Sequence, residues 1–349
     1  MQLEPRSETS LRLAITAPLM AVLAAMALSG FVVLWSGASP FSVFGLVAKG
    51  AMGSKFALLE TLTRATPLIF TGLAAAVAFR AKLWNIGGEA QLYVGAIMTV
   101  LLGTGALHLP AIVLVPLTIV AAALGGAATL LGPTLLKTRF GVDEVVTTLL
   151  LNFIVVLLVS LLLEGPLKDP TGLGWPQSQK VIAEATLPKL IQGKRLHLGF
   201  VLAVVAAIGI WVVNTRTTLG YEMRAVGHNP KAARFAGLPV NWVMVKTALL
   251  SGGLAGLAGM SEVAGLKGNL TLDLSPGFGY AGIVVAMLAL LNPLGVVAAA
   301  IFVAGIFVGA DAMSRTAGVP SYIAQVMVAT ALLCMVTAVM FTRYRLRWR

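Results

Sequence analysis

The stretch Val145-Val-Thr-Thr-Leu-Leu-Leu-Asn-Phe-Ile-Val-Val-Leu-Leu-Val-Ser-Leu-Leu-Leu163 carries no charge and is almost entirely aliphatic. A helix needs about 20 consecutive apolar residues to cross the hydrocarbon core of a bilayer. The stretch therefore predicts a membrane-spanning helix. Asn152 lies inside it, and because polar groups are costly within a membrane, this amide is a candidate functional residue.

The composition of the whole chain points the same way. Of its 349 residues, 58% are apolar and 11% are charged, whereas about a quarter of the residues of a soluble domain are charged. A soluble protein this apolar would expose large apolar patches. The composition excludes a soluble enzyme, a disordered chain and a disulfide-stapled secreted domain.

The net charge and the residues that could bind metal exclude further classes of protein. The net charge is +12, but the basic residues lie between apolar runs, which is typical of membrane orientation rather than nucleic-acid binding. Arg343–Arg349 resembles a cytoplasmic anchor. The single Cys334 lies in an apolar run and the three histidines are scattered, so we expect no disulfide, no metal site and no cofactor.

Apolar runs along the chain predict an all-α polytopic membrane protein of about ten transmembrane helices. The predicted spans are approximately residues 13–35, 66–79, 92–103, 110–136, 145–163, 198–213, 242–259, 280–291, 294–310 and 322–341. Residues 37–64 are expected to hold a helix at the outer interface. Between 66 and 104, one span broken near 80–91 and two separate spans fit equally well.

Ten spans place both termini on the same side of the membrane. The segments on that side hold fourteen Lys and Arg, against five in the opposite segments when the loop 164–197 is set aside. Because basic residues favour the cytoplasmic side, we expect both termini and the segment 214–241 to be cytoplasmic and 164–197 to be external. We expect a single transmembrane domain over 1–349.

Two short small-residue-rich stretches, 88–96 and 277–286, resemble each other and run in opposite directions in this topology. Such a pair is typical of an inverted repeat, which places a transport pathway at the repeat interface. Chance similarity among Gly-, Ala- and Val-rich helices is the other interpretation.

The segment 214–241 is longer than a connection between two spans requires. Within it, Asn229 is a good N-cap and Pro230 fits the first helical position, whereas Gly237 and Pro239 are stop signals. This pattern predicts a short cytoplasmic helix. It is either an ordinary connecting loop or, as its length favours, a docking element for a soluble partner.

Catalytic motifs are absent from the sequence. No phosphate-binding loop, nucleophile elbow, His-Glu-x-x-His motif or carboxylate cluster occurs, so we expect that the chain is not an enzyme and does not hydrolyse ATP itself. An ion-coupled secondary transporter is the alternative from a different class. It would need a charged relay buried within the spans, and few candidates for one are present.

Four motifs carry a family resemblance. Gly220-Tyr-Glu-Met-Arg-Ala-Val-Gly-His-Asn-Pro-Lys-Ala-Ala-Arg-Phe-Ala-Gly237 resembles the coupling loop of ABC-importer permeases of the simple-sugar and branched-chain amino acid superfamily. Asn85-Ile-Gly-Gly-Glu-Ala-Gln-Leu-Tyr-Val-Gly95, residues 141–152 and residues 275–283 resemble motifs of its nucleoside-type branch, with Ala90 where Gly is usual. Sugar permeases usually show Gly-Ile-Asp-Leu-Ser where this chain has Gly-Gly-Glu-Ala-Gln, which favours nucleosides over sugars.

The resemblance implies that 1–349 is a single permease domain in a bacterial inner membrane. It also implies an assembly and a set of coupling residues. The implied partners are cytoplasmic ABC ATPase subunits, a second permease subunit (a heterodimer rather than a homodimer), an external solute-binding protein and the membrane lipid. The expected solute is a purine nucleoside or nucleobase, with a ribose-type sugar as the alternative. The residues expected to couple the chain to the ATPase are Gly220, Arg224, Gly227, Asn229, Pro230, Ala233, Arg234 and Gly237.

Polar residues near the spans are the candidates for the solute pathway. They are Asn85, Glu89, Gln91 and Asn152. Glu89 fits a pathway role and a structural role as the cap of a half-helix equally well. Glu262 is expected to be solvated near an external span end. No Arg or Lys is expected near mid-membrane, which favours a neutral, hydrogen-bonding solute.

Overall fold

The computed structural model describes most of the chain, in two units. The described residues are 2–5, 11–35, 39–105, 107, 109–172, 174–317, 326, 329–331, 333–334, 337–338 and 344–347. One unit comprises Met1–Thr61 with Ile301–Arg349, and the other comprises Leu62–Ala300. The second unit contains all the predicted pathway and coupling residues.

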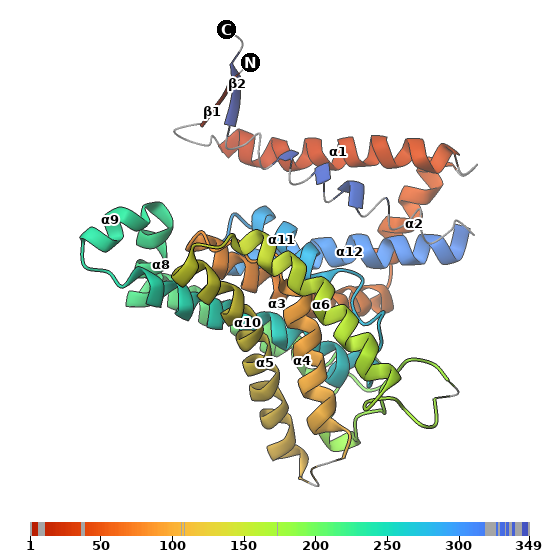
Figure 1. Cartoon of the computed structure of the whole chain (residues 1–349). Coiled ribbons are helices and arrows are strands. Elements are labelled where there is room, and N and C mark those ends of the chain that lie inside the picture. Colours follow the sequence, from red (N-terminus) through yellow and green to blue (C-terminus); the bar gives the residue numbers. More distant parts are fainter. Residues whose placement is uncertain are drawn as a thin grey trace. The chain divides into compact units, whose positions relative to one another are not determined.

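The described residues form helices, one pair of short strands and connecting loops (Figure 1). The α-helices are α1 (Leu11–Trp35), α2 (Pro40–Met52), α3 (Lys55–Arg80), α4 (Gly88–Gly103), α5 (Ala111–Phe140), α6 (Glu144–Glu164), α7 (Leu198–Arg216), α8 (Thr218–His228), α9 (Pro230–Phe235), α10 (Val240–Glu262), α11 (Phe278–Leu288) and α12 (Pro293–Ala317). A 3-10 turn, η1 (Ala183–Ala185), and a π-helix, η2 (Val263–Lys267), complete them. The strands are β1 (Gln2–Pro5) and β2 (Tyr344–Arg347), which pair antiparallel.

Six described helices are long and apolar enough to cross a membrane: α3, α5, α6, α7, α10 with η2, and α12. The chain is thus a multi-pass helical protein, but the count of ten spans is not confirmed. The helix α1 coincides with the first predicted span. The tenth predicted span, 322–341, lies largely outside the described residues.

Two predicted spans are short helices. The α4 helix has 16 residues and α11 has 11, which correspond to lengths of about 24 and 16 Å. A bilayer core is about 30 Å thick, so α11 in particular is too short to cross it. Residues 66–104 form two separate helices, α3 and α4, joined by the linker 81–87.

Two boundaries differ from the sequence prediction. The α3 helix begins at Lys55 rather than near residue 66. Within the stretch 37–64 the helix α2 ends at Met52, and the residues from Lys55 on continue directly into the apolar run. The α10 helix extends past residue 259 through Glu262, and η2 then continues it to Lys267. Both differences bring charged residues, Arg64 and Glu262, into long helices.

The second unit has two distinct ends. At one end, Asn241 donates to the carbonyl of Thr138 at 3.4 Å, which brings the end of α5 to the start of α10. At the other end, the loop 164–197 covers the helix termini, and the N–H of Ile182 donates to the carbonyl of Gly103 at 2.8 Å. Figure 1 shows α8 and α9 at the opposite side of this unit from that loop. We call these the coupling end and the loop end.

Close packing of α10 on α5 forms the centre of the second unit. A Cβ atom added to Gly256 would lie 2.2 Å from the carbonyl oxygen of Ala122, and one added to Gly252 would lie 2.4 Å from that of Gly126. Glycine at both positions therefore lets the two backbones touch, as small residues do between membrane helices.

The first unit has a small core of its own. Val33, Val43, Ala310 and Met313 are buried together, so α1, α2 and α12 pack around them. The β1–β2 pairing, with Gln2 opposite Arg347, brings the two ends of the chain side by side.

Candidate functional site

The two short helices α4 and α11 meet at their N-termini. Gly88 and Gly279 are in backbone contact: a Cβ added to Gly88 would lie 3.3 Å from the Cα of Gly279. From this meeting point α4 runs to Gly103 at the loop end. The α11 helix runs the other way, since Leu291, just beyond it, accepts a hydrogen bond from Arg80 at the coupling end. The arrangement resembles the broken helices that form transporter binding sites.

Glu89 lies between the two helix starts. Its carboxylate accepts a hydrogen bond from the backbone N–H of Gly279 at 2.7 Å, and only 6% of the residue is exposed. Helix N-termini carry unpaired N–H groups and partial positive charge, both of which favour a carboxylate there. The structure thus gives Glu89 a capping role on α11, in addition to its place in the first turn of α4.

One face of α6 holds the linker 81–87 and the start of α4 through three residues spaced four apart. Glu144 accepts from the N–H of Trp84 at 3.1 Å, and the hydroxyl of Thr148 accepts from the N–H of Ile86 at 3.2 Å. Asn152 accepts from the N–H of Ala90 at 2.9 Å and donates to the carbonyl of Ile86 at 3.0 Å. Buried non-helical backbone needs such partners, because lipid offers none.

A reciprocal amide pair holds the inside of the same bend. Asn85 donates to Oε1 of Gln91 at 3.0 Å, and Gln91 donates back to Oδ1 of Asn85 at 2.8 Å. Asn85 also donates to the hydroxyl of Ser251 on α10 at 3.1 Å, and Ser251 donates to the carbonyl of Ala74 on α3 at 2.7 Å. The network therefore connects α3, α4 and α10.

The structure brings the four predicted pathway residues to one region. Asn85 and Gln91 form one pair, Glu89 lies in the same first turn of α4, and Asn152 approaches from α6. Each is at most 6% exposed and hydrogen-bonded to protein groups. Contact between these side chains and a solute remains a prediction. Among the described residues, no group of three or more His, Cys, Asp and Glu could hold a metal ion.

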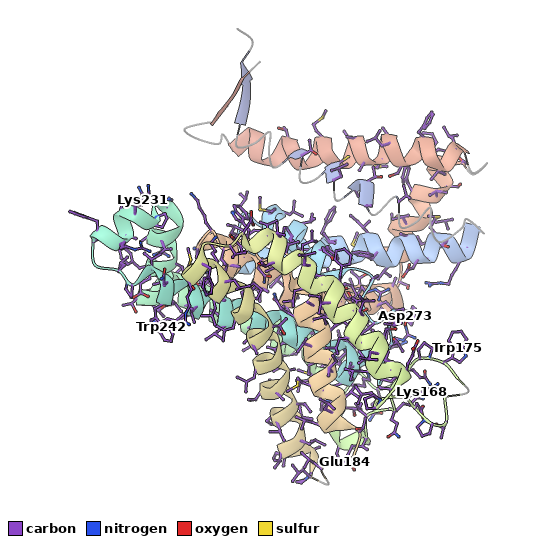
Figure 2. The ribbon with its side chains drawn as sticks, in the orientation of Figure 1. Lys168, Trp175, Glu184, Lys231, Trp242 and Asp273 are labelled. Atoms are coloured by element: carbon purple, nitrogen blue, oxygen red, sulfur yellow. The ribbon has the colours of Figure 1, made fainter. Side chains whose placement is uncertain are left out.

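The predicted coupling helix is present as α9. The side chain of Asn229 accepts from the N–H groups of Lys231 and Ala232 at 3.0 and 3.1 Å, Pro230 occupies the first turn, and Gly237 follows with a φ of +85°. A second helix, α8, precedes it and is capped by Thr217; the sequence pattern did not predict this helix. Figure 2 shows Lys231 on this segment and Trp242 just beyond it, far from Lys168 and Trp175 in the loop 164–197.

One of the expected coupling residues, Ala233, is not on the exposed surface of α9. Ala233 is only 5% exposed and faces the protein, whereas Phe235 is 98% exposed. The exposed cations of this helix, Lys231 and Arg234, lie on either side of Ala233 in sequence. Phe235 is therefore the large apolar side chain that α9 exposes to solvent.

The α8 helix connects this segment to the membrane helices. A Cβ added to Gly227 would lie 2.1 Å from the carbonyl oxygen of Arg80, so α8 touches the end of α3. Arg224 donates to the carbonyl of Asn214 at the end of α7. Arg80 in turn donates to the carbonyl of Leu291 at 2.9 Å, just beyond α11. A continuous path of contacts thus runs from α8 through Arg80 to α11.

Several polar residues of this region were not predicted from the sequence or lie elsewhere than predicted. Glu262 is fully buried, which corrects the expectation that it is solvated, and Arg64 lies within α3, which corrects the expectation of no cation inside the spans. Both errors came from helix boundaries. Tyr280, which accepts from Asn152 at 3.0 Å, lies in the 275–283 motif but was not predicted as a site residue, and Ser251 gave no recognisable pattern in the sequence. The i, i+4 spacing of Glu144, Thr148 and Asn152 is a signal that could have been found.

Comparison with known proteins identifies the class. Residues 57–337 match the family described as "Branched-chain amino acid transport system / permease component", and the chain belongs to this family. It is a multi-pass membrane permease of the ABC importer type, as the resemblance of its motifs implied.

Individual relatives cover nearly the whole chain. It is 36% identical to a glucose ABC transporter permease of Haloferax volcanii, over 99% of this chain and 93% of that protein. It is 35% identical to a guanosine ABC transporter permease of Bacillus subtilis, over 90% of this chain and 91% of that protein. It is 30% identical to a nucleoside ABC transporter permease of Lactococcus lactis, over 89% of this chain and 88% of that protein.

Proposed function

We propose that the chain is the membrane subunit of an ATP-driven importer that takes up a purine nucleoside. The match to a guanosine permease and a nucleoside permease over about nine-tenths of the chain carries this proposal. The region around the α4–α11 meeting point supports it, because Asn85, Gln91 and Asn152 supply neutral hydrogen-bonding groups. A purine nucleoside is a neutral solute with several donors and acceptors.

A simple sugar is the second candidate solute, and the 36% identity to a glucose permease favours it. Glucose and guanosine share one chemical feature, which is a pair of neighbouring hydroxyl groups. The Gly87–Gln91 stretch departs from the pattern usual in sugar permeases, and for this reason we rank the nucleoside first.

The proposed assembly follows the ABC importer plan. Cytoplasmic ATPase subunits bind the segment 214–241 at Phe235 and hydrolyse ATP, while this chain performs no covalent chemistry. A second permease, preferably a paralogue, completes the pore, and an external binding protein delivers the solute. Movement of α8 is passed to α11 through the Gly227–Arg80 and Arg80–Leu291 contacts. Glu89 then transmits it to α4.

We place the chain in the cytoplasmic membrane with both termini inside. The bias of basic residues supports this orientation, and the separation of the loop end from the coupling end agrees with it. Cysteines introduced singly at residues 225–235, in a chain with Cys334 replaced, test it. They should resist a membrane-impermeant thiol reagent in whole cells, whereas a cysteine at residue 184 should react. Labelling of 225–235 from outside contradicts the orientation.

Uptake assays test the solute. Cells that express the whole importer, and lack their own nucleoside and sugar uptake systems, are given labelled inosine, glucose and leucine. We expect rapid, ATP-dependent uptake of inosine. Preferred uptake of glucose supports the second candidate, and preferred uptake of leucine contradicts both.

A further inference from the structure

Glu262 is a buried carboxyl group without a hydrogen-bond partner. The residue is 0% exposed, and neither of its side-chain oxygens has a partner among the described residues. Burying a carboxyl without hydrogen bonds is costly, and ionisable groups inside membrane segments usually serve a function. The capping and linker-holding contacts described above do not involve Glu262, so they give no reason for its presence.

Two positively charged side chains act on the Glu262 carboxyl, so its surroundings are not purely apolar. The charges of Arg64 on α3 and Lys267 on η2 act on the carboxyl group. The guanidinium of Arg64 lies 5.5 Å from the centre of the Phe278 ring, a distance typical of a cation–π contact that fixes its direction. Phe278 is the first residue of α11, so this cluster adjoins the meeting point of α4 and α11.

The backbone at Glu262 is also irregular. The α10 helix changes into the π-helix η2 at the next residue, and single π-turns within α-helices occur frequently at functional sites. Contacts from the loop 164–197 hold this turn: Leu187 donates from its N–H to the carbonyl of Ala264 at 2.8 Å, and Lys189 donates to the carbonyl of Gly265. Glu262 is thus placed on a supported, distorted turn near the loop end.

We propose that Glu262 binds the neighbouring hydroxyl groups of the solute as the solute enters from the loop end. This inference rests on the proposed function. A carboxylate has two acceptor oxygens that match two adjacent O–H donors, and acidic residues bind ribose hydroxyls in this way in dinucleotide-binding proteins. The charges of Arg64 and Lys267 offset part of the cost that burial places on the charged carboxylate, although Lys267 also pairs with Asp273 at 3.7 Å. The pair of hydroxyls is common to nucleosides and sugars, so one residue serves both candidate solutes.

The experiment compares two solutes that differ only in these hydroxyls. Cells that express the complete importer take up labelled inosine or 2′,3′-dideoxyinosine, with wild-type permease or Glu262→Gln. The same binding protein serves both permeases, so its own preference cancels when the two inosine-to-dideoxyinosine ratios are compared. Glu164→Gln, the same change at an exposed carboxyl on α6, is the control.

We expect Glu262→Gln to lower inosine uptake roughly tenfold, the effect of losing a charge-assisted hydrogen bond, and to change dideoxyinosine uptake less than twofold. Glu164→Gln should change neither. Equal loss of both solutes at normal membrane levels of the variant shows a merely structural role, and no loss of either shows that Glu262 does not contact the solute. Both results overturn the inference.

A second measurement avoids substitution, in case Glu262→Gln does not fold. A hydrophobic carbodiimide modifies buried carboxyls, and mass spectrometry of the wild-type complex measures modification of the peptide that contains Glu262. Inosine and glucose should protect Glu262, whereas 2′,3′-dideoxyinosine should not; equal modification in all cases overturns the inference. If glucose protects Glu262 in an importer that fails to transport inosine, the solute is not the proposed nucleoside. The contact between Glu262 and the solute hydroxyls would still be supported.

Discussion

The carboxylate of Glu89 and the backbone N–H of Gly279 lie 2.7 Å apart, and this hydrogen bond joins the first turns of α4 and α11. The two residues are far apart in sequence and belong to helices that run in opposite directions from their meeting point. One carboxylate therefore serves two helix N-termini, where partial positive charges would otherwise repel. Movement of either short helix must carry the other with it or break this bond.

Removal of the Glu89 carboxylate should destabilise the permease. Glu89→Ala leaves the buried N–H of Gly279 without its acceptor, which costs about 1–3 kcal/mol. Glu89→Gln retains an acceptor oxygen and should lose less. Thermal unfolding of the purified complex measures both, with Glu184→Ala in the exposed loop as the control. Equal unfolding temperatures for Glu89→Ala and wild type would show that the bond does not hold the two helices.

Asn152 should matter more than its neighbours on α6. Asn152→Leu removes the partners of the Ala90 N–H and the Ile86 carbonyl together, so we expect a loss of about 2–4 kcal/mol in the free energy of unfolding. Thr147→Val is the control, because the Thr147 hydroxyl bonds only to carbonyls at the start of its own helix. Chemical unfolding of the complex in detergent measures both. A loss no larger than that of Thr147→Val would contradict the role assigned to Asn152.

Much of the helical framework could be predicted from the sequence, because apolar runs of spanning length have few alternatives. The run 145–163 became α6, and the capping signals at Asn229 and Gly237 defined α9 closely. Prediction failed where charged residues interrupt apolar runs. Arg64 and Glu262 were read as signs of helix ends, but both lie within helices. Glu262 is fully buried in protein, and Arg64 is half-buried within α3.

The candidate site was only partly predictable. Asn85, Glu89, Gln91 and Asn152 stood out because polar groups are rare in apolar segments, and the structure does gather them. Their partners did not stand out. Ser251, Tyr280 and the carbonyl of Leu291 act through tertiary contacts between distant segments. Such contacts leave no local sign of which residues meet, even for Tyr280 within the 275–283 motif.

Bulk at Gly227 should uncouple the importer. In Gly227→Ala, the added Cβ would lie 2.1 Å from the carbonyl oxygen of Arg80, so α8 must move away from α3. We expect ATPase activity to lose its stimulation by the loaded binding protein and uptake to fall at least tenfold. Gly209→Ala is the control, since a Cβ there meets nothing within 4 Å and alanine favours the helix by about 1 kcal/mol. Normal stimulated uptake by Gly227→Ala would contradict this coupling path.

Phe235 is the exposed residue on which the proposed ATPase contact depends. A buried aromatic side chain at the centre of an interface often contributes 2 kcal/mol or more, so Phe235→Asp should weaken ATPase binding about thirtyfold or more. Co-purification with the ATPase measures this directly. Trp175→Asp, which replaces an aromatic residue 73% exposed in the loop 164–197, should leave ATPase binding unchanged. Equal co-purification of the two variants would place the ATPase contact elsewhere.

His197 should make the stability of the loop end depend on pH. Burial, with a smaller effect from the charge of Lys189, lowers the pKa of His197 from 6.5 to about 4. In the folded protein its Nδ1 accepts from the N–H of Gly199 at 3.1 Å, and protonation would replace this acceptor with a donor. Since the unfolded chain binds this proton more readily, the folded state is favoured above pH 6.5 and loses stability as the pH falls toward 4.

The full effect of this histidine is a loss of about 3 kcal/mol by pH 4. Thermal unfolding of the complex between pH 7.5 and 4 measures it, and His197→Gln should show a correspondingly flatter dependence because glutamine does not titrate. His228→Gln, at an exposed position at the end of α8, serves as the control and should keep the wild-type profile. Identical pH profiles for wild type and His197→Gln would show that the loop end does not depend on a neutral histidine.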